Sequence, residues 1–250
     1  MTLQTAIILA SGLSRRFRGY KLLVTIDGLK LVEYPIIALS SAGIRRLIVV
    51  ANSMYAKDLT NIALNYMDEV IVSINNEPER ENGYSLYIGL KECTSDRVIV
   101  SVADHLYPPQ VLYRLSYGCK EAYLCVSGER IPSTVNEDEA TKILADSDGT
   151  IVSIGKALSS YNYIDMGVFV MDRKRVLEAI EAMVGRQLEI KLSDIVQKLA
   201  LMKKAKVVDC TGIPWADVDT YEEYEALITV RRDLLSRIKR WILYEGLVGA

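Results

Sequence analysis

The first half of the sequence alternates apolar runs of strand length with segments of helical periodicity. The expected strands cover residues 5–10, 45–51, 69–74, 97–102 and 122–127. The expected helices between them cover residues 31–42, 56–67, 84–93 and 108–117. Nearly continuous apolar strands joined by helices are typical of a parallel sheet with both faces covered. The pattern therefore predicts an α/β fold with a Rossmann-like, mostly parallel central sheet flanked by helices.

The pattern changes after residue 128. Two short apolar runs flank Asp146-Ser147-Asp148-Gly149, which is a hairpin signal. The remaining expected elements are strands at 141–144, 151–154, 163–171 and 206–210, helices at 173–183 and 192–201, a polar loop over the site at 129–139, and one long terminal helix at 221–244. Because we find no repeat or linker, we expect one domain over 1–250. It would comprise an α/β half (1–128), a mixed second half (129–220) and a C-terminal helix (221–250).

Composition excludes several classes of function. The chain has 250 residues, 50% of them hydrophobic, and a net charge of −2, so no overall field attracts nucleic acid. Its basic residues are grouped locally, which points to a small anionic ligand. No apolar run reaches the roughly 18–20 residues that a membrane span needs, and we see no targeting peptide. The four cysteines form no Cys-x-x-Cys pair, so we expect a reducing, cytoplasmic compartment.

A turn of small residues and cations follows the first apolar strand. It reads Ser11-Gly12-Leu13-Ser14-Arg15-Arg16-Phe17-Arg18-Gly19-Tyr20-Lys21. Small side chains let backbone N–H groups approach phosphate oxygens, and Gly12 would allow a tight turn. Arg16 and Lys21 could neutralise the charge that moves when a phosphoryl bond breaks. We interpret the turn as a nucleoside triphosphate site, with a solvated basic turn as the alternative; it is neither a dinucleotide fingerprint nor a P-loop.

Three aspartates form a second set of candidates. Asp104 follows the fourth expected strand, where a carboxylate is a hard oxygen ligand suited to Mg²⁺. Ligands of parallel sheets bind beyond the carboxyl ends of strands, so Asp104 and Gly12 can face one pocket. Asp217 and Asp219 lie two residues apart and would share a face of an extended segment. The alternative is that such residues cap helices, with Asp219 or Thr220 at the start of the terminal helix.

Three further features have plainer alternatives. In Asn82-Gly83-Tyr84-Ser85-Leu86, amide and hydroxyl groups could contact a base, although local sequence favours helix capping by Asn82. His105, the only histidine, suits a structural role or a substrate hydrogen bond better than catalysis. The terminal segment carries an apolar stripe among basic residues, which favours core packing or a dimer face, with contact to an anionic bilayer as the alternative. The stripe is Leu227, Val230, Leu234, Ile238, Trp241 and Ile242.

Together these pieces resemble the sugar-phosphate nucleotidyltransferase superfamily, and more closely the archaeal CTP:inositol-1-phosphate cytidylyltransferases. The superfamily's opening motif, Leu-Ala-Ala-Gly-x-Gly-x-Arg and then lysine, is matched by residues 9–16 and Lys21. The closer resemblance depends on Asn82-Gly83-Tyr84-Ser85-Leu86, Asp104-His105-x-Tyr107, Glu139-Ala140-Thr141-Lys142-Ile143, Asp165-x-Gly167-x-Phe169-Val170 and Asp217-Val218-Asp219-Thr220. The matches occur in order over about residues 5–220, and the joint set is much more specific than the opening motif alone.

The resemblance implies a nucleotidyltransferase fold and the transfer of a cytidylyl group from CTP to inositol 1-phosphate, with Mg²⁺ as cofactor. It implies that 1–128 binds the nucleotide and 129–220 the acceptor. The implied nucleotide-binding residues are Leu9, Ala10, Gly12, Asn82 and Ser85. The other implied residues are Arg16, Lys21 and Asp104 for catalysis, Asp104, Asp217 and Asp219 for the metal, and Lys142 and Asp165 for the acceptor.

The sequence also departs from the family pattern. Ser14 replaces the second motif glycine, Tyr20 stands where proline usually precedes the lysine, and Ala103 replaces a glycine. In many archaeal relatives a membrane-embedded transferase domain follows in the same chain. We therefore expect either a separate membrane-embedded CDP-inositol-using partner or a longer parent chain; a homodimer and peripheral membrane contact stay open. The alternatives are a different acceptor (a sugar 1-phosphate, phosphocholine or molybdenum cofactor) and an inactive nucleotide-binding partner of a membrane transferase.

Overall fold

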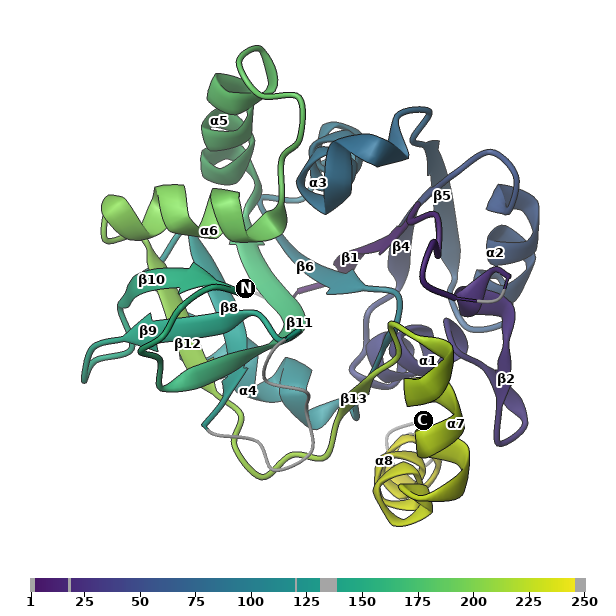
Figure 1. Cartoon of the computed structure of the whole chain (residues 1–250). Coiled ribbons are helices and arrows are strands. Elements are labelled where there is room, and N and C mark those ends of the chain that lie inside the picture. Colours follow the sequence, from purple (N-terminus) through teal and green to yellow (C-terminus); the bar gives the residue numbers. More distant parts are fainter. Residues whose placement is uncertain (1–2, 18, 120, 131–138, 246–250) are drawn as a thin grey trace.

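A nine-stranded mixed sheet runs through the computed structural model, which describes residues 3–17, 19–119, 121–130 and 139–245 (Figure 1). The strand order is β10-β9-β11-β6-β1-β4-β5, and β8 and β12 extend the sheet from the other edge of β11. The strands are β1 Thr5–Ala10, β4 Arg46–Ala51, β5 Glu69–Ile74, β6 Arg97–Val102, β8 Leu124–Glu129, β9 Lys142–Ala145, β10 Ile151–Gly155, β11 Tyr163–Asp172 and β12 Ala205–Asp209.

The four strands β6, β1, β4 and β5 are mutually parallel, as the first half of the sequence predicts. β11 joins them antiparallel to β6. β9 and β10 form the hairpin that the turn signal at 146–149 predicts. β11 bends between Asp165 and Phe169, where its register with β8 shifts and Gly167 has φ +74°. The second half is therefore mixed, also as predicted.

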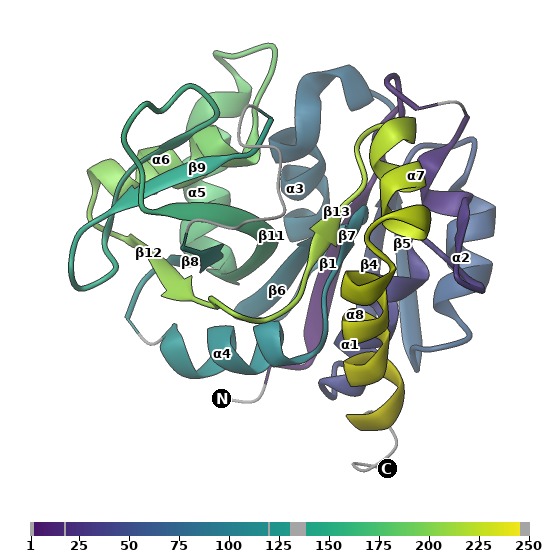
Figure 2. The same cartoon turned by 60° about the horizontal axis from the view of Figure 1, so that its bottom comes forward.

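Helices cover both faces of the sheet (Figures 1 and 2). Helices α3, α5 and α6 pack on one face and share its core with apolar side chains of β1, β4, β8 and β11. Helices α1, α2, α4, α7 and α8 contribute apolar side chains to the core of the other face. The helices are α1 Glu33–Ser41, α2 Ala56–Ala63, α3 Glu81–Glu92, α4 Gln110–Gly118, α5 Arg173–Val184, α6 Leu192–Leu201, α7 Tyr221–Thr229 and α8 Arg232–Glu245.

Several short elements were not predicted. The 3₁₀ turns Lys21–Leu23 and Pro78–Arg80 precede α1 and α3, and a small hairpin joins β2 (Thr25–Ile26) to β3 (Leu29–Lys30). The Asp27-Gly28 pair between these strands is a hairpin signal that the sequence offers. The other short pair joins β7 (His105–Leu106) to β13 (Ala216–Asp217), and it lies at the edge where β1 and β6 end.

The single long terminal helix was a wrong prediction. The helix ends at Thr229 and a second one begins at Arg232, because the N–H groups of Val230 and Arg231 both bond to the Ala226 carbonyl. The break allows Leu227 on α7 and Ile238 on α8 to be buried together, whereas Val230, a member of the predicted stripe, is 84% exposed. The predicted loop at 129–139 falls largely on residues 131–138, which lie outside the described residues; Glu129 itself ends β8.

Two of the four cysteines are paired with each other. Cys119 and Cys125 form a disulfide between the end of α4 and strand β8, while Cys93 and Cys210 are free and buried. No helix of the described part of the chain is both long and apolar enough to span a membrane.

Candidate active site

The cation-rich turn after β1 is held by contacts within the chain. Ser14, which replaces the family glycine, adopts a left-handed backbone with φ +51°, and its Oγ accepts the N–H of Lys21 at 3.3 Å. Gly12 is not the left-handed residue, and a Cβ built on it would meet no atom within 4 Å. The tight turn that Gly12 was expected to make is therefore made at Ser14, where a short polar side chain tolerates this conformation.

Tyr20, which stands in place of a proline, anchors the end of this turn. Its hydroxyl donates to the Ala10 carbonyl at 2.8 Å, and its ring stacks on Tyr55 with 3.5 Å between the ring centroids. The turn therefore returns to the end of β1 through a side chain. This contact places the next residue, Lys21, at the edge of the sheet.

Lys21 lies between two carboxylates from distant parts of the sequence. Its Nζ is 2.5 Å from Asp104 Oδ2 and 2.8 Å from Asp219 Oδ1. Burial alone would raise the pKa of Asp104, but Lys21 and His105 outweigh it and hold that pKa well below its usual range. Burial likewise opposes the charge of Lys21, yet the two carboxylates raise its pKa. Burial also opposes the charge of Asp219, but Lys21 and Arg16 lower its pKa, so all three groups are ionised at neutral pH.

Arg16 forms a second bridge across the site. Its guanidinium donates to Asp219 Oδ2 at 2.8 Å and to Glu139 Oε2 at 3.0 Å. Half of the Arg16 side chain is exposed, so these pairs are weaker than those of Lys21 and more easily exchanged for a ligand. Arg16 and Lys21, which were predicted to contact phosphates, thus both contact carboxylates in this structure.

Strand pairing brings Asp104 and Asp217 together. Asp217 on β13 is opposite His105 on β7, and the N–H of Val218 donates to the Asp104 carbonyl at 3.1 Å. Burial raises the pKa of Asp217, and its carboxylate has no hydrogen-bond partner among the described residues. Asp219 follows and contacts Lys21, so the three aspartates gather at one edge of the sheet, as the sequence predicts.

The capping alternative also holds, through Thr220 rather than Asp219. Thr220 is the N-cap of α7: its side chain accepts the N–H of Glu223, and the Glu223 carboxylate accepts the N–H of Thr220 at 2.9 Å. Asp219 is left free to contact the two cations. Capping of α7 therefore fixes the backbone on which Asp217 and Asp219 lie.

His105 supports the carboxylate of Asp104. Its Nδ1 is 2.8 Å from Asp104 Oδ1, and its ring stacks on Trp215, whose indole N–H donates to Glu129. The buried site lowers the tendency of His105 to take a proton, but its bond to Asp104 raises its pKa to about 9. Gly167 leaves room for this ring, because a Cβ there would lie 2.7 Å from His105 Cδ2.

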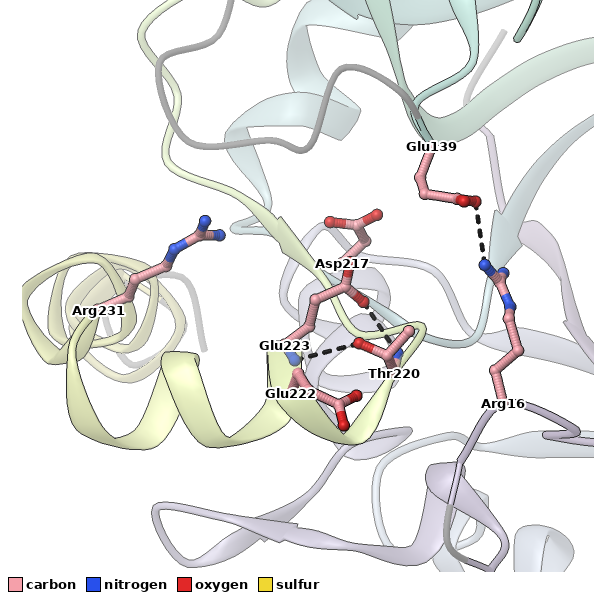
Figure 3. Close-up of a pocket in the computed structure, with 7 residues that line it drawn as sticks. All are labelled: Arg16, Glu139, Asp217, Thr220, Glu222, Glu223 and Arg231. Atoms are coloured by element: carbon pink, nitrogen blue, oxygen red, sulfur yellow. Dashed lines mark hydrogen bonds and ion pairs between the residues drawn. The ribbon is translucent and has the colours of Figure 1, made fainter.

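A cavity of about 360 Å³ opens beside these groups, between the cation-rich turn and α7 (Figure 3). Its lining contains four carboxylates and two arginines, and Arg16 and Arg231 lie on opposite sides of the cavity (Figure 3). The lining residues are Arg16, Glu139, Asp217, Thr220, Glu222, Glu223 and Arg231. A space with such walls suits a polar, charged ligand next to the aspartates.

A neutral polar cluster lies on the other side of β1. Ser11 follows β1, Asn52 follows β4 and Asn75 follows β5, so polar side chains end three adjacent parallel strands. Ser85 on α3 joins them, with its Oγ 2.7 Å from Ser11 Oγ. Of these four buried residues the sequence analysis singled out only Ser85. Ser11, Asn52 and Asn75 each lie directly after a predicted strand, and this shared position was the available signal.

The comparisons with known proteins fit this geometry. A family model described as "MobA-like NTP transferase domain" matches residues 6–200. The chain belongs to this family. It is therefore a nucleotidyltransferase domain, with the fold that the sequence predicts.

Individual relatives of this MobA-like domain are more specific. A "bifunctional IPC transferase and DIPP synthase" of Archaeoglobus fulgidus is 36% identical over 222 residues, and one of Thermococcus kodakarensis is 32% identical over 226 residues. These alignments cover 88% and 89% of this chain but only 42% and 49% of the relatives, so the chain spans about half the length of the curated relatives it matches. The solved structure of "the inositol-1-phosphate CTP transferase from T. maritima" is 30% identical, has a TM-score of 0.85 and aligns over 96% of this chain and 97% of its own.

Two of the predicted residues of the MobA-like domain lie in the second half. Lys142 on β9 has its ammonium 5.3 Å from the centre of the Tyr161 ring. Asp165 on β11 accepts the N–H of Gly167, and burial raises the pKa of Asp165 to about 6. Ile164, the residue before Asp165, is opposite Lys142 in the sheet. The backbones of the two predicted acceptor residues therefore lie close together.

Asn82 was predicted to cap the start of its own helix, but it caps the start of another one. It lies inside α3, and its Oδ1 accepts the N–H of Leu192 at 2.8 Å, so it caps the start of α6. The next residue, Gly83, packs against the segment that precedes α6. A Cβ on Gly83 would lie 2.6 Å from the Ile190 carbonyl oxygen. The Asn82-Gly83 pair thus joins two helices of the same face.

Proposed function

We propose that this chain transfers a cytidylyl group from CTP to inositol 1-phosphate, giving CDP-inositol and pyrophosphate. The observation that carries the proposal is the 30% identity and nearly full-length alignment with the inositol-1-phosphate CTP transferase of T. maritima. The curated relatives named as IPC transferases support the same activity. In this proposal residues 1–128 bind CTP and residues 129–220 bind the acceptor.

The chemistry requires little proton transfer from the protein. A phosphate monoester has a second pKa of about 6, so the acceptor is mostly a dianion at neutral pH. Its oxygen attacks the α-phosphorus; a new P–O bond forms, the bond to the β-phosphate oxygen breaks, and pyrophosphate leaves with the bonding electron pair. The protein has to hold two polyanions in line and neutralise them. This is consistent with a site that contains cations and carboxylates and whose one histidine is bonded to Asp104.

In this proposal Lys21 and Arg16 neutralise the triphosphate. Lys21 approaches from the turn after β1, and Arg16 lies on the same turn at the edge of the cavity. When CTP binds, its phosphates replace Asp219 and Glu139 as partners of these two cations. Ala10 and Gly12 present the backbone of the turn to the nucleotide, and Leu9 lies on the strand below them. Lys142 and Asp165 contact the acceptor phosphate and ring hydroxyls.

The donor set fits Mg²⁺ only in the presence of a substrate. Among the described residues no three His, Cys, Asp or Glu side chains form a cluster that could hold a metal ion alone. Asp104 and Asp219 nevertheless converge on one ammonium group, and Asp217 beside them has no hydrogen-bond partner in the described part of the chain. Mg²⁺ characteristically combines one or two carboxylates with substrate phosphates and water. When bound there it would screen the negative charge of the α-phosphate and the acceptor phosphate.

A nucleotide-by-acceptor matrix tests the proposed function. The chain is incubated with Mg²⁺ and CTP, UTP, GTP or dTTP, each with inositol 1-phosphate, glucose 1-phosphate, phosphocholine or phosphoglutamine. We expect pyrophosphate release and a product of the mass of CDP-inositol with the first pair, at the highest kcat/KM of the matrix. Asp104→Asn should abolish most of the rate, whereas Asp68→Asn at an exposed carboxylate should not. A higher kcat/KM with another acceptor, or no release at all, would contradict the proposal.

A further inference from the structure

A hydrogen-bonded group of three buried side chains lies beneath the start of the cation-rich turn. We call Ser11, Asn75 and Ser85 the amide–hydroxyl cluster; they are 3%, 1% and 2% exposed. Strand order places the cluster on the β4–β5 side of β1, whereas Asp104 follows β6 on the opposite side. The charged groups thus lie at one side of the turn and a neutral cluster at the other. A bound nucleotide that has its phosphates on the charged side would direct its base toward the neutral side.

The orientation of the Asn75 amide is fixed by the backbone. Its Oδ1 lies 2.8 Å from the N–H of Glu77, which can only donate. The other side of the amide, Nδ2, therefore faces the serines. It donates to Ser85 Oγ at 3.0 Å and to Ser11 Oγ at 3.3 Å.

The hydrogen bonds within the cluster do not use every hydroxyl hydrogen of its two serines. Each serine hydroxyl has one hydrogen and two lone pairs. Asn75 fills one lone pair on each oxygen, and the 2.7 Å contact between Ser11 and Ser85 uses one hydrogen and one further lone pair. One hydroxyl hydrogen remains. Its nearest recorded acceptor within the described residues is the Glu81 carbonyl, 3.4 Å from Ser85 Oγ, which is long for an O–H···O bond.

We propose that Asn75 is a positioning residue for nucleobase selection, which holds Ser11 and Ser85 so that one hydroxyl donates toward the base. The inference rests on the proposed function, because it assumes that a pyrimidine nucleotide is the substrate. Cytosine carries an acceptor at N3 that one donor can reach, whereas its O2 acceptor is shared with uracil. Uracil carries a hydrogen on N3, so the same donor would meet a second donor there. Discrimination then depends on the direction of a hydroxyl hydrogen that Asn75 controls.

Two substitutions change that direction in different ways. Asn75→Asp replaces the two donors by a carboxylate that can only accept, so it draws both hydroxyl hydrogens toward itself and leaves lone pairs for the base. Asn75→Ala removes the constraint without replacing it. Asn76→Ala is the matched control, because Asn76 is the exposed neighbour of Asn75 and its side chain forms no hydrogen bond with the described residues.

The test measures dissociation constants of CTP and UTP for the whole chain with Mg²⁺ by calorimetry, with circular dichroism to verify folding. We expect wild type and Asn76→Ala to prefer CTP. The CTP-over-UTP preference should fall about tenfold in Asn75→Ala, the equivalent of one hydrogen bond. In Asn75→Asp it should fall further or reverse. If Asn75→Asp does not fold, Asn75→Ala and Asn75→Ser decide the question.

Two results would overturn the inference. One is a wild type without preference between CTP and UTP. The other is an equal loss of affinity for both nucleotides in the Asn75 variants, which is what a merely structural role would produce. Because binding is measured without an acceptor, these results are distinguishable from a failure of the proposed transfer reaction, which the nucleotide-by-acceptor matrix detects separately.

Discussion

Lys21 fills the space between Asp104 and Asp219, with its Nζ 2.5 Å and 2.8 Å from their carboxylate oxygens. The three side chains come from the turn after β1, the end of β6 and the segment before α7. The Lys21 side chain is only 13% exposed, so the pairing is shielded from solvent and screened little by salt. The Lys21 ammonium thus lies between two carboxylates that are proposed to hold a metal ion.

Removal of the Lys21 ammonium should slow the proposed transfer strongly. Lys21→Ala takes away a cation that stabilises charge on the departing pyrophosphate, and one such electrostatic group is worth on the order of 10²–10³ in rate. Steady-state kinetics with CTP and inositol 1-phosphate measures the loss. Lys57→Ala serves as the control, since Lys57 is exposed on α2 and forms no ion pair with the residues that the structure describes. Near-wild-type kcat in Lys21→Ala would reject the assignment.

The same pairing predicts that the chain binds a metal ion weakly when no nucleotide is present. In wild type without nucleotide, Mn²⁺ as a probe for Mg²⁺ must compete with the Lys21 ammonium for Asp104 and Asp219, so we expect weak binding. Lys21→Met keeps the length of the side chain but removes the charge, which leaves the two carboxylates facing one another. Electron paramagnetic resonance of free Mn²⁺ should show tighter binding to Lys21→Met than to wild type. Equal affinities would show that Lys21 does not compete with the ion.

The sequence predicted the parallel half of the fold because each buried strand there is a continuous apolar run. β1, β5 and β6 have the predicted bounds, and β4 begins one residue later than predicted. The terminal helix could not be placed in this way. Its apolar stripe continues past Val230, and only the packing of Leu227 and Ile238 against the core shows where the helix breaks.

The site was predictable where a motif carries it and not where strand order does. Asp104 was identified as a carboxylate after a buried strand and Asp219 as one of two aspartates on an extended segment, and the structure brings both to Lys21. Asn75 has no motif, because it is one of two adjacent asparagines after β5, and only the neighbourhood of β1 and β5 across β4 brings it to Ser11. Sequence distance hides such contacts, which depend on the order of strands in the sheet.

Gly167→Ala should destabilise the chain and slow the reaction together. Gly167 has φ +74°, and a Cβ there would lie 2.5 Å from Val102 Cγ2 and 2.7 Å from His105 Cδ2. The left-handed backbone costs about 1–2 kcal/mol and the steric overlap about 1–3 kcal/mol more. The clash would also shift His105 and with it Asp104. Urea denaturation and kcat measure the two effects.

Gly212→Ala separates backbone strain from this clash. Gly212 has φ +86°, but a Cβ there would meet no atom within 4 Å. We therefore expect a loss of only about 1–2 kcal/mol and an unchanged kcat. If both alanine variants lose the same stability and neither loses activity, Gly167 does not hold His105 in place.

Asp165→Asn should stabilise the folded chain in a pH-dependent way. Burial raises the pKa of Asp165 in the folded state to about 6, whereas an unfolded chain has it near 3.8. Below the unfolded value both states are protonated and the carboxyl costs nothing. As pH rises from about 4 through 6, the unfolded state ionises first, so wild type loses stability. Above that range the cost is about 1–3 kcal/mol, given that one pKa unit corresponds to about 1.4 kcal/mol.

Asn retains the oxygen that accepts the Gly167 N–H, so the substitution removes the charge and little else. Urea denaturation of both proteins between pH 4 and pH 8 should show the variant more stable at pH 8, with the difference vanishing toward pH 4. A difference that is constant across this range would mean that the Asp165 carboxyl is not the cause. Because Asp165 is proposed to contact the acceptor, the variant should also raise the KM for inositol 1-phosphate while leaving the KM for CTP unchanged. The chain would then keep a carboxylate that lowers its stability at neutral pH because the acceptor needs it.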